Sequence, residues 1–421
     1  MYRLNLNELT NKTNELIESA STMEESRKKA TFFTRAGKMG FTVLMYFMIN
    51  TFSESCQTAL NKFFKGTETH VSQQAFSKAR NKFDHTPFLK LFRMTAEEMY
   101  TGEYEFDTFM GYRVSAIDGT TVGLPNSKNV EELIKEFGGI GAKADSPAAR
   151  GSIQLDILND MIMDAIIGPL STDERTMAKE HIETLIKTTK QEKEIILFDR
   201  GYASNELIEQ LTEANICFVM RIKRKFNTKI DLAPMGKSEI IYQTGKKRVK
   251  LKVVKFILSS NELEMLLTNI PEELTIEEYK RLYFLRWPVE TKYDIVKNKL
   301  EIECFTGYTP NGIRQDFYTT MYLANIISVA VSEANEIVDE ERNHKGNKND
   351  HKVNVNDAIG SFKDEFINAC IQKSRKKRSK MVKKIIEEIA RSVIPIRPER
   401  STPRPVTTRK SKFHHNHKSN A

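Results

Sequence analysis

Cysteine is scarce in this 421-residue chain, and the four cysteines stand far apart. They are Cys56, Cys217, Cys304 and Cys370, and no two of them form a Cys-x-x-Cys pair. This spacing argues against a zinc site and against a disulfide framework. We therefore expect a protein of a reducing compartment, the cytoplasm.

The sequence also lacks a long apolar run. Its best candidates are FTVLMYFMIN at 41–50, which is short, and YLANIISVAVSEANEIV at 322–338, which contains Asn, Ser and Glu. A membrane span needs roughly 20 apolar residues, so we expect two buried helices and no membrane partner. The first 20 residues show no charged segment followed by an apolar core, so we expect no secretion signal.

Positive charge is concentrated at one end of the chain. The formal net charge is +9, but the residues from Lys373 onward hold 16 Lys and Arg against three Glu. Residues 1–372 therefore sum to about −4. A basic end of this kind favours a nucleic-acid partner, although a stretch such as SRKKRSKMVKK can also be simply a solvated helix end.

Helix-forming and strand-forming segments divide the chain. Residues 1–105 are rich in helix formers, and within them a Gly66 break followed by Ser72 resembles a helix-turn-helix, with Gln73, Gln74, Lys78 and Arg80 on its second helix. Any αα-hairpin with a glycine turn looks similar, so DNA contact there remains open.

Aliphatic and β-branched runs begin near residue 111 and alternate with helical segments, which indicates a mixed α/β sheet. The glycine-rich GGIGAKADSPAARG lacks the Walker pattern and is interpreted as a flexible connection. The expected regions are a helical DNA-binding region (1–105), an α/β catalytic core (106–305) with a β-rich insertion at about 223–272, a helical C-terminal region (306–392) and a disordered basic tail (393–421).

Two aspartates end apolar strand segments: Asp118 in VSAIDGT and Asp199 in IILFDRG. Asp is depleted within strands, and a carboxylate at a strand end stands at the sheet edge, where active sites of α/β folds usually lie. A single such Asp is more often a turn residue. Together with Glu290 on a later helix, the pair predicts a site for Mg²⁺ or Mn²⁺, with two ions able to act on a phosphodiester.

A third pattern surrounds Glu290. In RLYFLRWPVETKYDIVKNKL, the residues Tyr283, Arg286, Glu290 and Lys297 fall within about 60° around one helix, along roughly 21 Å. Pro288 predicts a kink in that helix. We expect Trp287, the only tryptophan, to lie in the core rather than to contact a DNA base.

These motifs resemble those of the IS4 family of DDE transposases. YFLRWPVETKYDIVK fits that family's Tyr, Arg, Glu, Lys spacing, and IDGT (117–120) and DRGY (199–202) look like the surroundings of its two aspartates. The resemblance spans residues 40–335 and implies a ribonuclease H-like core with a β-strand insertion before the Glu helix. It also implies Asp118, Asp199 and Glu290 as catalytic metal ligands, with Tyr283, Arg286 and Lys297 as DNA-binding residues.

The expected function is then metal-dependent cleavage at the ends of a mobile element and strand transfer into target DNA. Because two element ends must be held together, we expect a homodimer on double-stranded DNA. Two alternatives stay open: a ribonuclease H-like nuclease without strand transfer, and a catalytically silent DNA-binding protein.

Overall fold

The computed structural model describes residues 3–35, 37–50, 55–126, 130–138, 147–188, 193–245, 247–343 and 350–396. Most of the glycine-rich connection, residues 139–146, and most of the basic tail, residues 397–421, lie outside the described residues. The expectations for those two segments are therefore not addressed by the structure.

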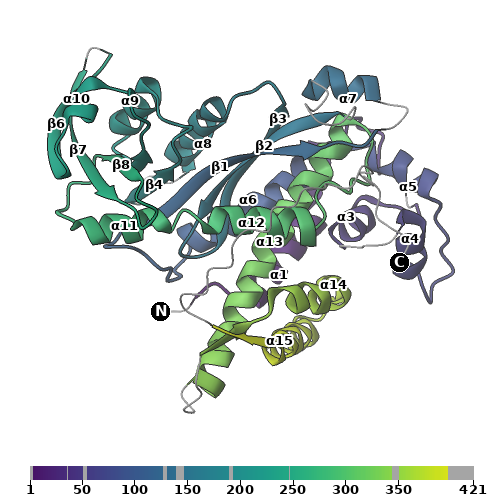
Figure 1. Cartoon of the computed structure of the whole chain (residues 1–421). Helices are drawn as coiled ribbons and strands as arrows, with labels where there is room; N and C mark the ends of the chain where they lie inside the picture. Colours follow the sequence, from purple (N-terminus) through teal and green to yellow (C-terminus); the bar gives the residue numbers. More distant parts are fainter. Residues whose placement is uncertain are drawn as a thin grey trace.

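One eight-stranded sheet forms the centre of the molecule (Figure 1). Its strands are β1 (Arg113–Gly123), β2 (Ala148–Asp156), β3 (Met161–Pro169), β4 (Glu194–Phe198), β5 (Cys217–Arg221), β6 (Gly236–Thr244), β7 (Lys247–Ile257) and β8 (Leu263–Thr268). The spatial order is β3-β2-β1-β4-β5-β8-β7-β6. The first three strands pair antiparallel, whereas β1–β4 and β4–β5 pair parallel. This confirms the expected mixed α/β, ribonuclease H-like core.

The predicted β-rich segment extends this same sheet. β8 joins β5 antiparallel, and β7 and β6 follow as antiparallel neighbours. The turn between β6 and β7 contains Gly245 at a φ of +53°, a left-handed conformation that favours glycine. The predicted β-rich segment thus consists of antiparallel strands.

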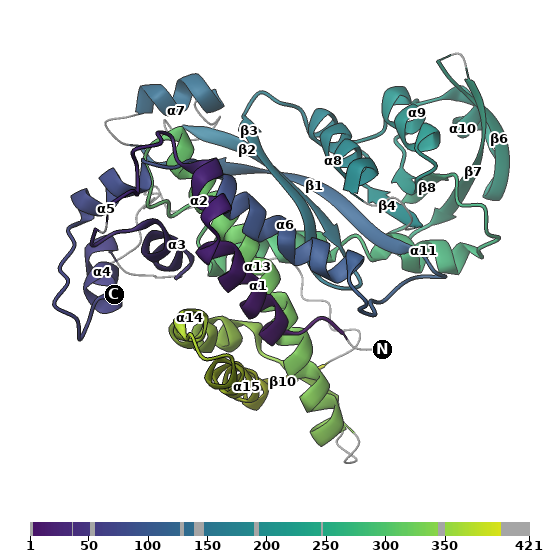
Figure 2. The ribbon, with the colours of Figure 1, turned by 180° about the vertical axis from the view of Figure 1, so that it is seen from behind.

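Helices cover both faces of the sheet (Figures 1 and 2). One face packs against α8 (Glu174–Thr188) and α9 (Asn205–Glu213), with Ile117, Ile196 and Phe198 in its core. The other faces α6 (Thr86–Thr101) and the long α13 (Pro310–Val338), with Val114, Ala116 and Leu197 in its core. Alternate residues of β1 and β4 thus enter different cores, as the two-residue period of a strand requires.

The N-terminal region is helical: α1 (Leu6–Glu18), α2 (Ala20–Ser26), α3 (Phe41–Ile49), α4 (Cys56–Phe63) and α5 (Gln73–Arg80). Ser72 caps α5, accepting a hydrogen bond from the Ala75 amide, as expected. Arg80 is the last residue of this helix, on which the sequence predicted it. Its guanidinium is buried and pairs with Asp316 at 2.8 Å, because α13 packs over this end of α5.

The remaining elements flank the sheet or follow α13. They are α7 (Val130–Phe137), α10 (Thr228–Leu232), α11 (Ile276–Phe284), α12 (Pro288–Asp294), the π-helix η1 (Ile295–Lys299), the π-helix η2 (Asp339–Asn343), α14 (Val355–Ile371), α15 (Arg375–Arg391) and the short pair β9 (His351–Val353) and β10 (Val393–Pro395). No helix in the described part of the chain is long and apolar enough to cross a bilayer.

Candidate active site

The pairing of β1 with β4 brings Asp118 and Asp199 together. The last parallel pair of the ladder is Ala116 with Leu197; Asp118 lies two residues further along β1, and Asp199 is the first residue after β4. The charges of both aspartates act on the Arg286 and Tyr202 side chains, so both carboxylates lie near these two residues. Asp118 shares the alternation of Ala116, so it is directed to the face that α13 covers.

Helix α12, which carries Glu290, packs on β1 from that same face. The Tyr293 hydroxyl of α12 donates a 2.6 Å hydrogen bond to the backbone carbonyl of Asp118. Val289 of the same helix is fully buried. Helix α12, which carries Glu290, is therefore held against the middle of β1, where Asp118 lies. The prediction that Asp118 ends its strand is wrong, because β1 continues to Gly123 in antiparallel pairing with β2.

The segment that carries Glu290 is three short helices rather than one. Thr275 and Glu278 form a capping box that begins α11. A turn follows Phe284, and Pro288 then occupies the first turn of α12, where its missing N–H has no cost. The expected kink at Pro288 is thus a complete break, and the π-helix η1 follows α12 directly.

Because of this break, the four residues of the predicted stripe have different surroundings. Tyr283 and Arg286 are buried, and Arg286 donates a 3.1 Å hydrogen bond to the Glu290 carboxylate, whose side chain is 34% exposed. Lys297, in η1, donates to the Thr121 carbonyl of β1 at 2.8 Å and lies 3.8 Å from Glu303. Tyr283, Arg286 and Glu290 thus stay near the aspartates, whereas Lys297 stands further along β1.

The acids of this site interact with the positive charge of the Arg286 guanidinium. Burial raises the pKa of Asp118 to about 6, and the charges of Glu174 and Glu290 add to that rise. The Gly119 amide and Arg286 act in the opposite direction. The pKa of Arg286 is raised, since the charges of Tyr283, Glu290, Asp199 and Asp118 outweigh its burial. Arg286 therefore interacts with all three predicted acids.

Two buried polar atoms at this site have no hydrogen-bond partner within the described structure, the Tyr202 hydroxyl and Arg286 Nε. The pKa of Tyr202 is raised well above its usual value by burial and by the charges of Asp118, Glu174 and Asp199. A buried polar atom without a partner is costly and often marks a place where another group binds.

The donor chemistry of this site fits a divalent cation, since carboxylate oxygens are the ligands that Mg²⁺ and Mn²⁺ prefer. The conformation does not present a finished ligand set. Among the described residues, no three His, Cys, Asp or Glu side chains are grouped closely enough to hold one ion. In this conformation the Arg286 guanidinium supplies the positive charge that the acids attract.

Sequence reasoning missed three residues of the site. Glu174 begins α8 and reaches within 2.8 Å of the position that a Cβ on Gly119 would occupy. Tyr202 stands in the quoted DRGY motif but received no role, and Tyr293 lies three residues after Glu290. The spacing between Glu290 and Tyr293 could have pointed to Tyr293, since residues at i and i+3 lie on the same helix face. Nothing in the sequence pointed to Glu174.

The prediction for Trp287 is wrong. Its side chain is 49% exposed and lies against the Arg286 guanidinium, whose central carbon is 5.6 Å from the ring centroid. The helix break places Trp287 in the exposed turn between α11 and α12, so it cannot reach the core. Phe284 beside it is also half-exposed.

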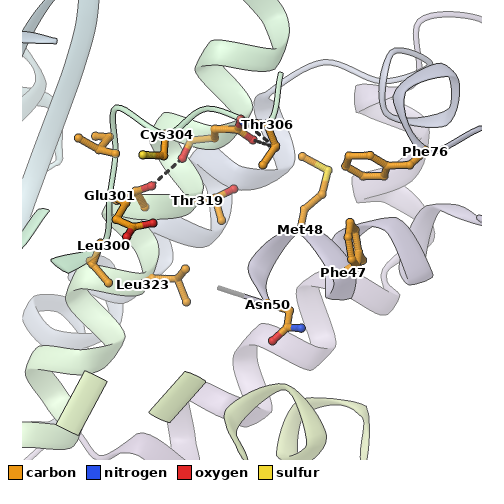
Figure 3. A pocket seen from close by; sticks show the side chains of 13 residues that line it. Phe47, Met48, Asn50, Phe76, Leu300, Glu301, Cys304, Thr306, Thr319 and Leu323 are labelled. Atoms are coloured by element: carbon orange, nitrogen blue, oxygen red, sulfur yellow. Dashed lines mark hydrogen bonds between the residues drawn. The ribbon is translucent and has the colours of Figure 1, made fainter. Parts of the chain in front are cut away.

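A pocket of about 40 Å³ lies elsewhere, between the N-terminal helices and α13 (Figure 3). Phe47, Met48 and Phe76 line one side, and Thr319 and Leu323 of α13 line the other. None of the predicted catalytic residues reaches it, and a space of this size holds only a few water molecules. We do not assign a function to it.

The chain is similar to proteins of a known family. The family model described as "Transposase DDE domain" matches residues 109–326, just over half of the chain. A solved structure of a piggyBac transposase, in a synaptic complex with hairpin DNA, is similar with a TM-score of 0.46 and 12% sequence identity, covering 91% of this chain and 85% of that chain. No curated protein matches the sequence.

Proposed function

Because the chain belongs to the family of enzymes with a transposase DDE domain, we propose that it is the transposase of an insertion sequence of the IS4 type. It cleaves DNA at the two ends of its element and joins the freed 3′ ends to target DNA, in a cut-and-paste reaction. The observation that supports this most is the parallel pairing of β1 with β4, which brings the segments that carry Asp118 and Asp199 side by side, with the Glu290 helix packed on β1.

Asp118, Asp199 and Glu290 are the proposed metal ligands, in a family that depends on divalent metal ions. Two Mg²⁺ or Mn²⁺ ions, when bound, would activate the attacking oxygen and stabilise the leaving oxygen at the phosphorus. Burial raises the pKa of Asp118 to about 6, and the charge of Arg286 offsets this rise only in part. Tyr202, with an unpaired buried hydroxyl, is available to donate to an oxygen at the same place.

The DNA-binding roles fall to the cations and aromatic residues around the acids. Arg286 is held by Glu290 through one Nη atom, which leaves its other donors for phosphate oxygens. Tyr283, buried near this guanidinium, is the second proposed DNA-binding residue. Lys297 would contact a phosphate further along β1. The exposure of Trp287 favours the base contact that the sequence left as the less expected role.

A strand-transfer assay tests the proposal. A labelled duplex carrying the element end, taken from the DNA that flanks the gene, is incubated with protein, Mg²⁺ and an unlabelled circular target. The wild type is expected to cut the end and to link label covalently to the target. Glu290→Gln should abolish both products, whereas Glu277→Gln, an exposed acid on the preceding helix, should leave them unchanged.

Each other outcome selects an alternative. Cutting without any label on the target identifies a nuclease of the same fold. If the wild type binds the element end but, like Glu290→Gln, does not cut it, the protein is a catalytically silent DNA-binding protein. If the reaction occurs, mass measurement of the protein–DNA complex should show two copies of the chain on paired ends, and the cytoplasm is the expected compartment.

A further inference from the structure

A row of lysines occupies the solvent side of α15. Lys376, Lys377, Lys380, Lys383 and Lys384 are all exposed, and we call them the α15 lysine face. No acid occurs between Lys373 and Ile386. The helix lies beside α14 and α13 (Figure 1), outside the segment that matches the transposase family model. The family match therefore assigns nothing to this face.

The geometry of the helix concentrates these charges. At 100° per residue the five lysines fall within about 120° of one another, along roughly 12 Å of helix. Val382, Ile385, Ile386 and Ile389 occupy the opposite side and are buried. The sequence thus builds an amphipathic helix whose whole polar face carries one sign of charge over its first three turns.

The α15 lysine face has almost no neutralising partners. Lys383 lies 3.8 Å from Glu387, and no ion pair involves the other four lysines within the side chains that the structure describes. Some exposed lysines elsewhere are paired, for instance Lys247 with Glu213 at 2.5 Å and Lys250 with Glu239 at 2.8 Å. The difference lies in the surroundings, because exposure is similar in both places.

This arrangement costs the free protein stability. Lys376–Lys380 and Lys380–Lys384 are like charges at i, i+4, each pair costing about 0.2–0.5 kcal/mol. Lys376 and Lys377 also stand in the first turn, where the helix dipole disfavours cations. The helix is nonetheless held firmly: buried Arg378 donates to the Gln372 carbonyl at 2.8 Å and to Asn11 of α1 at 2.7 Å. The charges are therefore presented on a fixed surface.

We propose that the α15 lysine face binds the phosphate backbone of double-stranded DNA without reading its sequence. The proposal rests on the proposed function, because a transposase must hold DNA beyond the few nucleotides at its active site. Lysine ammonium groups act as point charges on phosphates and release condensed counterions when they bind. Each strand of the duplex carries one phosphate per about 3.4 Å of helix axis, which offers several contacts over the length of this face.

The test measures DNA binding of the full chain by fluorescence anisotropy over a series of salt concentrations, with a 40-base-pair duplex of arbitrary sequence. The variant Lys376→Gln/Lys380→Gln/Lys384→Gln should reduce the slope of log Kobs against log salt by about 3, roughly one for each phosphate contact. The same three positions changed to Arg should keep the wild-type slope. The matched control is Lys90→Gln/Lys247→Gln/Lys250→Gln, which removes three paired lysines and should change the slope much less.

A wild-type slope in the α15 variant, or an equal drop in the control variant, would overturn the proposal. The proposal would also be overturned if the α15 variant lost binding to vesicles of anionic lipid while its binding to DNA stayed unchanged. Thermal unfolding without DNA should show the α15 variant at least as stable as the wild type, because repulsion is removed. Asp118→Asn should bind DNA with the wild-type slope and fail to cut it, which separates this surface from the catalytic proposal.

Discussion

Two groups of carboxylates at the same sheet differ in their hydrogen-bond partners. Glu194, at the start of β4, is buried and accepts hydrogen bonds from Arg113 at 2.8 Å and Ser115 at 2.6 Å. Asp164 on β3 is buried and lies 2.7 Å from His181 Nδ1. Asp118, in the middle of β1, and Asp199, directly after β4, accept from the backbone amides of the residues that follow them. Partnered acids hold the sheet together, whereas under-compensated acids are available for chemistry.

The comparison shows why perturbed carboxylates alone do not identify an active site. Burial raises the pKa of both Glu194 and Asp118, to about 7 and about 6 respectively. Glu194 is nevertheless surrounded by side-chain donors, whereas Asp118 has two further acids nearby and an unpaired tyrosine hydroxyl. The surroundings separate a structural ion pair from a functional acid.

The largest expected effect comes from the open acids. Asp118→Asn should reduce metal-dependent DNA cleavage by at least about 10³-fold, since it removes a proposed ligand of the metal that supplies several kcal/mol of transition-state stabilisation. Its melting temperature should stay the same or rise, because a partly buried charge is lost. Cleavage rates under single-turnover conditions and thermal unfolding measure the two effects. A variant that is both active and less stable would place Asp118 with the structural acids.

The opposite result is expected at the partnered end of the sheet. Arg113→Ala leaves Glu194 buried without its cation and should lower the free energy of unfolding by about 3–5 kcal/mol. The double variant Arg113→Met/Glu194→Leu should recover much of that loss, because two apolar side chains replace the pair. Urea unfolding of the three proteins measures this. Equal losses in the single and double variants would mean that packing, not charge, is what the pair contributes.

His181 links the two groups. Its ring joins Asp164 on one side and Ser152, at 2.9 Å, on the other, and the Ser152 hydroxyl donates to the Asp118 carbonyl at 3.2 Å. His181→Phe should fill the space but leave Asp164 without its partner, costing about 1–3 kcal/mol in unfolding. Chemical unfolding checks the loss, and a substitution without cost would show that Asp164 finds another donor.

The smallest effect concerns pH. Burial, together with the charge of Arg314, lowers the pKa of His85, whose ring stacks on Tyr318 at 5.6 Å between centroids. A histidine with a lowered folded-state pKa takes up a proton more readily when unfolded, so stability falls as pH drops through the ordinary value of about 6.5. Each pKa unit corresponds to about 1.4 kcal/mol. His85→Phe keeps the stack and should make the free energy of unfolding vary less between pH 5 and 7.5.

Local chemistry in the sequence was enough to single out Asp118 and Asp199, because an acid after an apolar run is a signal that needs no distant partner. It did not show that β1 continues past Asp118, because that depends on pairing with β2. Nor did it show the burial of Arg80, whose partner Asp316 is 236 residues away, or the exposure of Trp287, which depends on how the break before Pro288 turns the chain.

Helix α13 sets a limit on how this molecule can be divided. The segment shared with the family ends at residue 326, in the middle of a 29-residue helix. Beyond that point Val329, Ala330 and Ala334 continue its apolar side, and the helix contacts α1, α14 and α15 as well as β3. A fragment ending at residue 326 would cut α13 in two and expose the apolar side of the helix to water. The shortest fragment that we expect to fold on its own therefore extends beyond the segment that matches the family model.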